Sequence, residues 1–242
     1  MTHDHEQHLF ILPIEEDNPV RHTPWAVYTL MALNALVFAV LFFEDKSAIY
    51  RSDGFIPADP NLLDGLTSAF LHGSFWHLLG NMVFLWMFGD NVEDVIGPVF
   101  LTSCFLFCTY VSLLFYLPFN SDSEIPLVGA SGAISGLIGM YWVFFPRARA
   151  RLIFYVFRWK VGEVYTTVHA AVFAWFLEQA LLGAALGVTS LDDHIPTAFL
   201  AHVGGFFAGV LIGYQFLNLG FVRRYAEKRK HSDLWGYVDL GA

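Results

Sequence analysis

Three short stretches of the sequence place polar side chains that could do chemistry inside long apolar runs. They are HLLGN at 77–81, VGASGAISG at 128–136 and AHVGGFFAG at 201–209. A serine hydroxyl becomes a nucleophile when a neutral histidine removes its proton, and N–H groups can stabilise the oxyanion that forms next. The sequence therefore offers Ser131 as nucleophile and His202 as general base. His77, Asn81 and the backbone N–H of Ser131 are the candidate oxyanion donors.

Each of these side chains also has an ordinary structural explanation. Small residues such as those around Ser131 are common where membrane helices touch. His77 and Asn81 are four residues apart, on one face of a helix, and such a pair can simply join helices by hydrogen bonds. A single histidine such as His202 is more often structural than reactive. The choice depends on whether the surrounding elements bring all four side chains together.

The composition places the chain in a membrane. Of the 242 residues, 56% are hydrophobic and 14% are charged, and the mean hydropathy is +0.51. These values lie outside the usual range for a soluble globular domain. The net charge of −9 comes mainly from acidic residues in the N-terminal tail and short loops, so it says little about partners. We expect no nucleic-acid partner, no metal and no cofactor.

Six windows are apolar enough to be membrane spans, since about 20 apolar residues cross a hydrocarbon core of about 30 Å. They are Pro24–Phe43, His72–Gly89, Pro98–Leu117, Ser131–Phe145, Val164–Leu186 and Thr197–Leu219. The sequence therefore predicts an all-α polytopic membrane protein, built as a bundle of six transmembrane helices. Its predicted parts are a polar tail (1–23), the six-span domain (24–219) and a basic tail (220–242).

Basic residues predict the orientation of the chain. Arg147, Arg149, Arg151, Arg158 and Lys160 lie between the fourth and fifth windows, and Arg223, Arg224, Lys228, Arg229 and Lys230 follow the sixth. Such clusters usually stay in the cytoplasm. We therefore expect a multi-pass protein of the plasma (inner) membrane with both termini cytoplasmic. The second, fourth and sixth windows then begin on the external side, which brings His77, Asn81, Ser131 and His202 to one depth in the outer half of the membrane.

Glycines on the fourth and sixth windows predict that these two helices pack closely. Gly132 and Gly136 lie on the fourth window, and Gly205 and Gly209 follow His202 on the sixth. Backbones that approach closely would bring the Ser131 hydroxyl within hydrogen-bond distance of His202. No Asp or Glu is placed to orient this histidine, so the pattern predicts a dyad rather than a triad.

In this order, the three motifs resemble those of the rhomboid family of intramembrane serine proteases. The matching elements are HLLGN with the preceding His72, GASG at 129–132 and AHVGGFFAG at 201–209. The resemblance implies a six-span rhomboid fold of the bacterial type, a Ser131–His202 dyad, and His77 with Asn81 as oxyanion donors. It also implies cleavage of single-span transmembrane substrates near the external face, with membrane lipids as the other partners. The supporting residues are His72, Gly129, Gly132, Gly205 and Gly209.

Two positions depart from the pattern of some rhomboid relatives. Leu66-Thr67 stands where some carry a Trp-Arg pair, and Ser135 stands where some carry an aromatic residue that stacks on the base. The sequence does not identify another aromatic neighbour for His202.

Two other functions remain open. A catalytically inactive, rhomboid-like protein that binds membrane clients would typically have lost Ser131 or His202, and both are present. A channel or transporter would need a polar path across the whole bilayer. Glu178, in the fifth window, is the residue that keeps this second alternative open.

Overall fold

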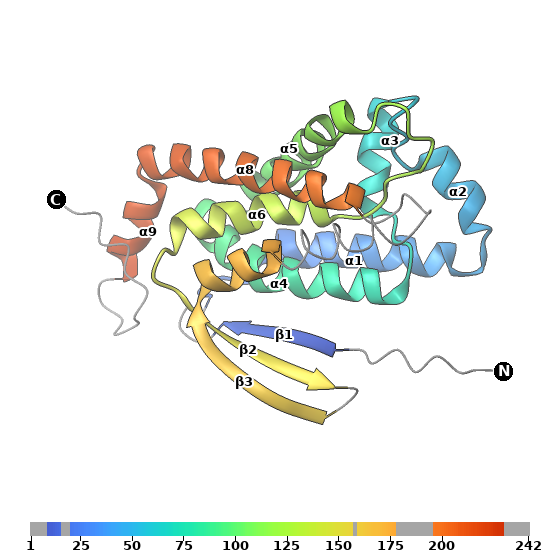
Figure 1. Ribbon diagram of the computed structural model, residues 1–242. Coiled ribbons are helices and arrows are strands. Elements are labelled where there is room, and N and C mark those ends of the chain that lie inside the picture. The colour runs from blue at the N-terminus through green and yellow to red at the C-terminus, as the bar shows by residue number, and fades with distance from the viewer. Residues whose placement is uncertain (1–8, 16–19, 157–158, 178–195, 230–242) are drawn as a thin grey trace.

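The protein is described here by a computed structural model that covers residues 9–15, 20–156, 159–177 and 196–229 (Figure 1). The helices are α1 (Trp25–Val40), α2 (Lys46–Asp53), α3 (Leu62–Thr67), α4 (Phe75–Ile96), α5 (Pro98–Tyr116), α6 (Ser131–Phe144), an unlabelled helix (Val168–Leu177), α8 (Pro196–Asn218) and α9 (Phe221–Arg229). The strands are β1 (Leu9–Glu15), β2 (Arg149–Val156) and β3 (Trp159–Thr167).

Apolar helices make up most of the described chain. Within the described residues, three helical stretches are long and apolar enough to cross a membrane, namely Trp25–Phe43, Pro98–Phe119 and Phe199–Asn218. Helix α6 and the helix Val168–Leu177 are apolar but shorter. Helix α4 has 22 residues, and His77, Asn81 and Asp90 lower its hydropathy. The predicted helical membrane bundle is confirmed, whereas the number of six spans stays a prediction.

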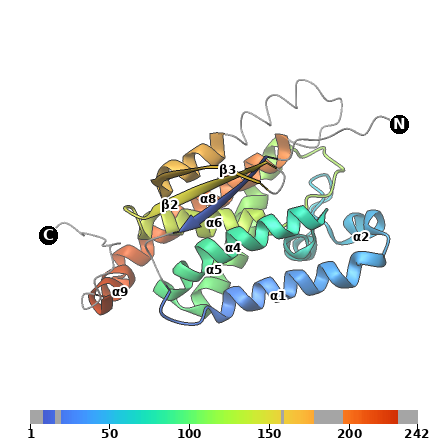
Figure 2. The same ribbon diagram turned by 90° about the horizontal axis from the view of Figure 1, so that it is seen from below.

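Helix α6 occupies the centre of the bundle. All of its residues except Ser131 and Trp142 are buried, and it packs against α4, α5 and α8 (Figures 1 and 2). A helix surrounded in this way must be apolar on every side, which explains why its sequence shows no polar face. The position of Ser131, the first residue of α6, is therefore fixed by the packing of the neighbouring helices around α6.

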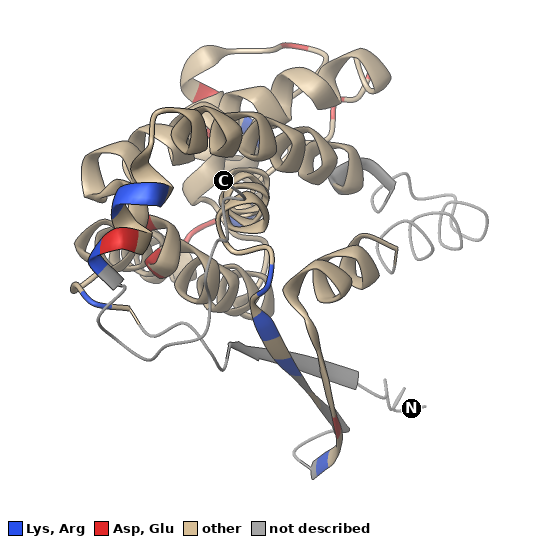
Figure 3. Cartoon of the chain, turned by 90° about the vertical axis from the view of Figure 1, so that its left-hand side faces the viewer, with Lys and Arg blue, Asp and Glu red and all other residues tan. Residues whose placement is uncertain are grey.

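Basic residues gather at one end of the bundle, which we call the basic end (Figure 3). Arg147 and Arg149 follow α6 there, and Arg223 and Arg224 lie on α9. Helices α4, α6 and α8 all begin at the opposite end (Figure 1). Their first turns therefore lie at a similar depth, as the alternating directions of the predicted spans require.

A three-stranded antiparallel sheet, which the sequence analysis did not predict, lies beside the helices. Its order is β1-β2-β3. The fifth span was expected to begin at Val164, but β3 continues to Thr167 and the helix begins at Val168. Aromatic and β-branched residues such as Tyr165 favour extended backbone, and hydropathy alone cannot separate an apolar strand from the start of a helix. The rest of the predicted span, including Glu178, lies outside the described residues.

Both predicted tails contain regular structure. Strand β1 is residues 9–15 of the expected polar tail, and it pairs with β2 along its whole length. Helix α9 lies within the expected basic tail. Residues 1–8 and 230–242 lie outside the described part of the chain, and the domain boundaries at 24 and 219 stay predictions.

Near the basic end, a buried carboxylate caps the start of α1. The two oxygens of Glu93, on α4, accept hydrogen bonds from the backbone N–H groups of Ala26 (3.0 Å) and Val27 (2.9 Å). The residue at the N-cap position of α1 makes no side-chain cap of its own. The next residue, Asp94, accepts a hydrogen bond from the hydroxyl of Tyr225 on α9 (3.0 Å). This corner therefore joins α1, α4 and α9.

We expect Glu93→Ala to lower the free energy of unfolding by about 2 kcal/mol, because two buried N–H groups at a helix start lose a charged acceptor. Thermal unfolding in detergent measures the effect. Glu227→Ala is the control, because Glu227 is an exposed carboxylate on α9 at the same end of the bundle. A Glu93→Ala protein as stable as this control would contradict the capping role.

Candidate active site

A turn that requires glycine precedes Ser131, the first residue of α6. Gly129 has a backbone φ of 126°, a value that residues other than glycine rarely adopt. Its N–H donates to the carbonyl of Ser68 (2.8 Å). A Cβ atom at this position would lie 2.7 Å from Cε1 and 2.8 Å from Nε2 of His77. The turn thus sets Ser131 beside His77. The N–H groups of the first turn of α6 have no partner within the helix, so they stand at its positive end.

The segment before this turn is held by the connection between α2 and α3. Phe55 and Leu127 exchange backbone hydrogen bonds of 3.1 and 2.8 Å, and the N–H of Ala58 donates to the carbonyl of Ser123 (3.0 Å). The position of the nucleophile candidate therefore depends on a loop far away in the sequence as well as on α6.

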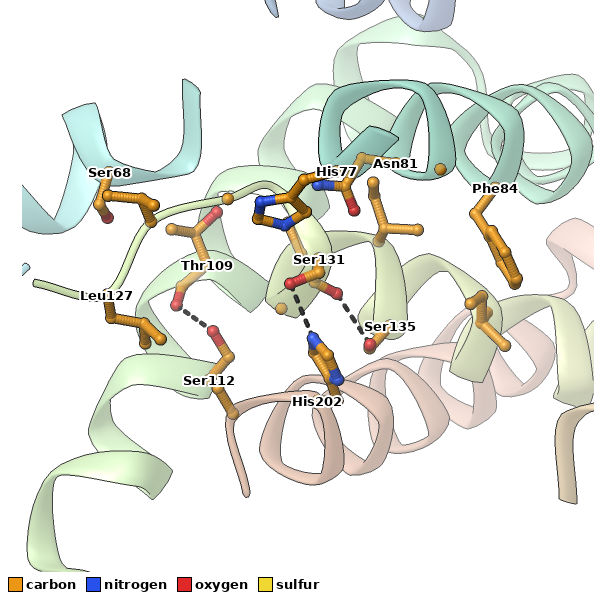
Figure 4. Close-up of a pocket in the computed structure, with 18 of the residues that line it drawn as sticks. Ser68, His77, Asn81, Phe84, Thr109, Ser112, Leu127, Ser131, Ser135 and His202 are labelled. Atoms are coloured by element: carbon orange, nitrogen blue, oxygen red, sulfur yellow. Dashed lines mark hydrogen bonds between the residues drawn. The ribbon is translucent and has the colours of Figure 1, made fainter. Parts of the chain in front are cut away.

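Ser131 and His202 lie at hydrogen-bond distance. The Nε2 atom of His202, on α8, is 2.7 Å from the Oγ atom of Ser131 (Figure 4). The imidazole is buried, with 8% of the residue exposed. Helix α8 comes this close because glycines face α6, and a Cβ atom on Gly205 would collide with the carbonyl oxygen of Gly132. The expected close packing of these helices is therefore present where it brings the two side chains together.

His77 and Asn81 lie on the side of Ser131 opposite His202 (Figure 4). Ser74 caps α4 by accepting a hydrogen bond from the N–H of His77 (3.1 Å). The Nδ2 atom of Asn81 is 2.8 Å from Nε2 of the buried His72. A side-chain amide nitrogen carries two hydrogens, so one can be held by His72 while the other faces the space beside Ser131.

A pocket of about 290 Å³ opens beside these residues. Its walls combine apolar side chains such as Phe84 with hydroxyl groups from α5 and α6. Ser112 donates to the carbonyl of Thr109 (2.7 Å), and Ser135 donates to the carbonyl of Ser131 (2.8 Å; Figure 4). The nucleophile, base and donor candidates therefore border one space that can hold a short piece of peptide.

Two residues of the site were missed by the sequence analysis. The backbone carbonyl of Ser68 accepts the hydrogen bond from the N–H of Gly129. Because this contact uses a backbone atom, the identity of residue 68 could not indicate it. Trp175, on the helix Val168–Leu177, is the aromatic neighbour of His202 that the sequence could not identify. Its stretch contains no motif, and the contact depends on how three helices are rotated against one another.

Comparison with known proteins identifies the family. A family model described as the Rhomboid domain matches residues 60–219, a range that includes every candidate site residue. The chain belongs to the rhomboid family. The family resemblance seen in the three motifs is therefore confirmed, while the bacterial type is not.

This rhomboid is similar to several eukaryotic proteins. It is 28% identical to "Rhomboid protein 1, mitochondrial" of Saccharomyces cerevisiae, over 88% of this chain and 58% of the yeast protein. It is 24% identical to "RHOMBOID-like protein 5" of Arabidopsis thaliana, over 82% of this chain and 70% of the relative. It is 27% identical to "Presenilin-associated rhomboid-like protein, mitochondrial" of Mus musculus, over 65% of this chain and 45% of the mouse protein. The chain thus spans little more than half of the yeast relative and less than half of the mouse one.

The prediction of a plasma-membrane location is wrong by this comparison. The yeast and mouse relatives carry names that state a mitochondrial location. Basic clusters report which side of a membrane a loop occupies, and they carry no information about which membrane it is. A multi-pass membrane protein remains supported by the family and by the apolar helices.

Proposed function

We propose that this rhomboid is an intramembrane serine endopeptidase that uses a Ser131–His202 dyad. The observation that carries the proposal is the 2.7 Å separation of Ser131 Oγ and His202 Nε2 at the start of a buried helix, beside a pocket. A structural hydrogen bond would need neither the pocket nor the oxyanion donors on the other side of the serine. Their coincidence favours catalysis over an inactive, client-binding rhomboid.

In the first step, Ser131 Oγ attacks the carbonyl carbon of the scissile peptide bond while His202 Nε2 takes its proton. The imidazole must be neutral to accept that proton. Negative charge then develops on the carbonyl oxygen. The N–H of Ser131 and the side chains of His77 and Asn81 can donate to this oxygen, and the positive end of α6 adds to the stabilisation.

In the second step, the protonated His202 returns its proton to the leaving amine, the peptide bond breaks, and an acyl-enzyme on Ser131 remains. A water molecule, deprotonated by the same histidine, then hydrolyses the ester and releases the new carboxylate. His72 contributes by holding the Asn81 amide, so that the donor is oriented before the substrate arrives.

The substrates that fit this site are single-span transmembrane proteins, with membrane lipids as the surrounding partner. The Ser131–His202 pair lies toward the membrane face opposite the basic end, because α4, α6 and α8 all begin there (Figure 1). Cleavage is therefore expected near that face. The names of the yeast and mouse relatives favour a mitochondrial membrane as the place of action.

Labelling with a serine-directed fluorophosphonate tests the proposal. The purified protein should become labelled, and mass spectrometry should locate the adduct on Ser131. Ser135 is the internal control, because its hydroxyl is one helical turn away and donates to a backbone carbonyl. An unlabelled protein, or one labelled equally on Ser135, would favour the client-binding alternative.

We expect Asn81→Ala to cleave substrate about 10²–10³-fold more slowly than the wild type, since an oxyanion donor is worth about that much while other donors remain. Cleavage rates of a fluorescent transmembrane substrate in liposomes measure the loss. His72→Gln, which keeps a hydrogen-bonding partner for Asn81, should lose less. A loss for Asn81→Ala as large as that for Ser131→Ala would instead indicate that Asn81 is needed for the fold.

A further inference from the structure

The indole ring of Trp175 stacks on the imidazole of His202. The indole belongs to the helix Val168–Leu177, and it borders the same pocket as Ser131. Its ring lies 5.6 Å from the His202 ring, centroid to centroid, with an angle of 29° between the planes. This is a stacked arrangement, the geometry in which one ring limits the rotation of the other.

The indole is itself held by a second aromatic ring. Phe84, on α4, lies 5.7 Å from Trp175 with an angle of 34° between the planes. Phe84 in turn stacks on Phe88 at 6.0 Å. Trp175 is therefore fixed between α4 and α8, and its orientation does not depend on its own helix alone.

A histidine serves as a base for serine only while its Nε2 lone pair points at the hydroxyl. Rotation of the imidazole about its χ2 torsion would move Nε2 away from Ser131 Oγ, and that torsion is soft for histidine. An indole stacked on one face opposes this rotation, because the ring would have to leave the stack to turn.

We propose that Trp175 is a positioning residue for His202, which holds the imidazole in the orientation that accepts the Ser131 proton. The inference rests on the proposed proteolytic function and adds a residue from a helix that carries none of the three motifs. Phe84 contacts the indole and helps to hold it in place.

Matched substitutions of Trp175 test the role. Trp175→Leu and Trp175→Met remove the ring and keep apolar bulk, whereas Trp175→Phe keeps a ring that can stack. We expect kcat to fall about tenfold in the first two and less than about threefold in Trp175→Phe, with KM changed less than twofold, from the usual strength of an aromatic pair. Phe173→Leu is the control on the same helix, since the side chain of Phe173 is exposed.

The rate at which a small fluorophosphonate labels Ser131 provides a readout that does not depend on binding a transmembrane substrate. It should follow the same order as kcat, and thermal unfolding should identify any variant that is merely unstable. Wild-type rates in both ringless variants would overturn the inference, as would a loss in Trp175→Phe or in the Phe173→Leu control as large as the loss in the ringless variants. A wild-type protein that neither cleaves nor reacts at Ser131 would overturn the proposed function, and this inference with it.

Discussion

Ser131→Ala is expected to lose cleavage by at least about 10⁴-fold, because it removes the atom that forms the acyl-enzyme. His202→Ala should lose a similar amount, since the serine hydroxyl is a poor nucleophile without its base. The two losses should not add in the double variant, because both side chains act in one step. Cleavage of a transmembrane substrate in liposomes measures all three proteins.

The control for this prediction is the neighbouring serine. Ser135 is completely buried and donates to the carbonyl of Ser131, so Ser135→Ala deletes one hydrogen bond and adds no bulk. This bond runs back to a carbonyl four residues earlier in the same helix, and such bonds add nothing to helix stability, so this variant should keep both its stability and most of its activity. Substantial cleavage by purified Ser131→Ala, or an inactive but stable Ser135→Ala, would show that the nucleophile was assigned to the wrong serine.

The sequence could predict that the candidate site residues come together, because this depends on three features: span direction, residue spacing and glycine positions. Alternating span directions give three helices that begin at one end, and the spacing of His77 and Asn81 gives one helix face. Glycine positions then indicate where two backbones can approach. These features follow from helix periodicity and small side-chain volume, which are local properties of the sequence.

Other parts of the molecule could not be predicted in this way. The antiparallel sheet depends on strand pairing between residues 9–15 and 149–156, more than a hundred residues apart. The stack of Trp175 on His202 depends on how one helix is rotated against another, and hydropathy does not report that rotation. The hydrogen bond from Gly129 to Ser68 uses a backbone carbonyl, which leaves no trace in residue identity.

The crossing of α6 and α8 is closest at glycines one turn into α6 and two turns beyond His202. A Cβ atom added to Gly209 would collide with the carbonyl oxygen of Gly136 and come within 2.5 Å of its carbonyl carbon and 2.8 Å of its Cα. These are backbone atoms, which cannot turn aside as a side chain can. By contrast, a Cβ atom added to Gly136 would first meet the side chain of Cys108.

We therefore expect Gly209→Ala to force α8 away from α6 and to lower the free energy of unfolding by about 1–3 kcal/mol, the usual cost of overpacking. Activity should fall further, because a displacement of about 1 Å between nucleophile and base can cost on the order of 10²-fold in rate. Thermal unfolding in detergent and cleavage rates in bilayers measure the two effects. Gly80→Ala, where a Cβ atom on α4 meets nothing within 4 Å, is the control for stability. A Gly209→Ala protein with wild-type stability and activity would mean that the two helices do not approach closely in the membrane, and that Ser131 and His202 are brought together by other contacts.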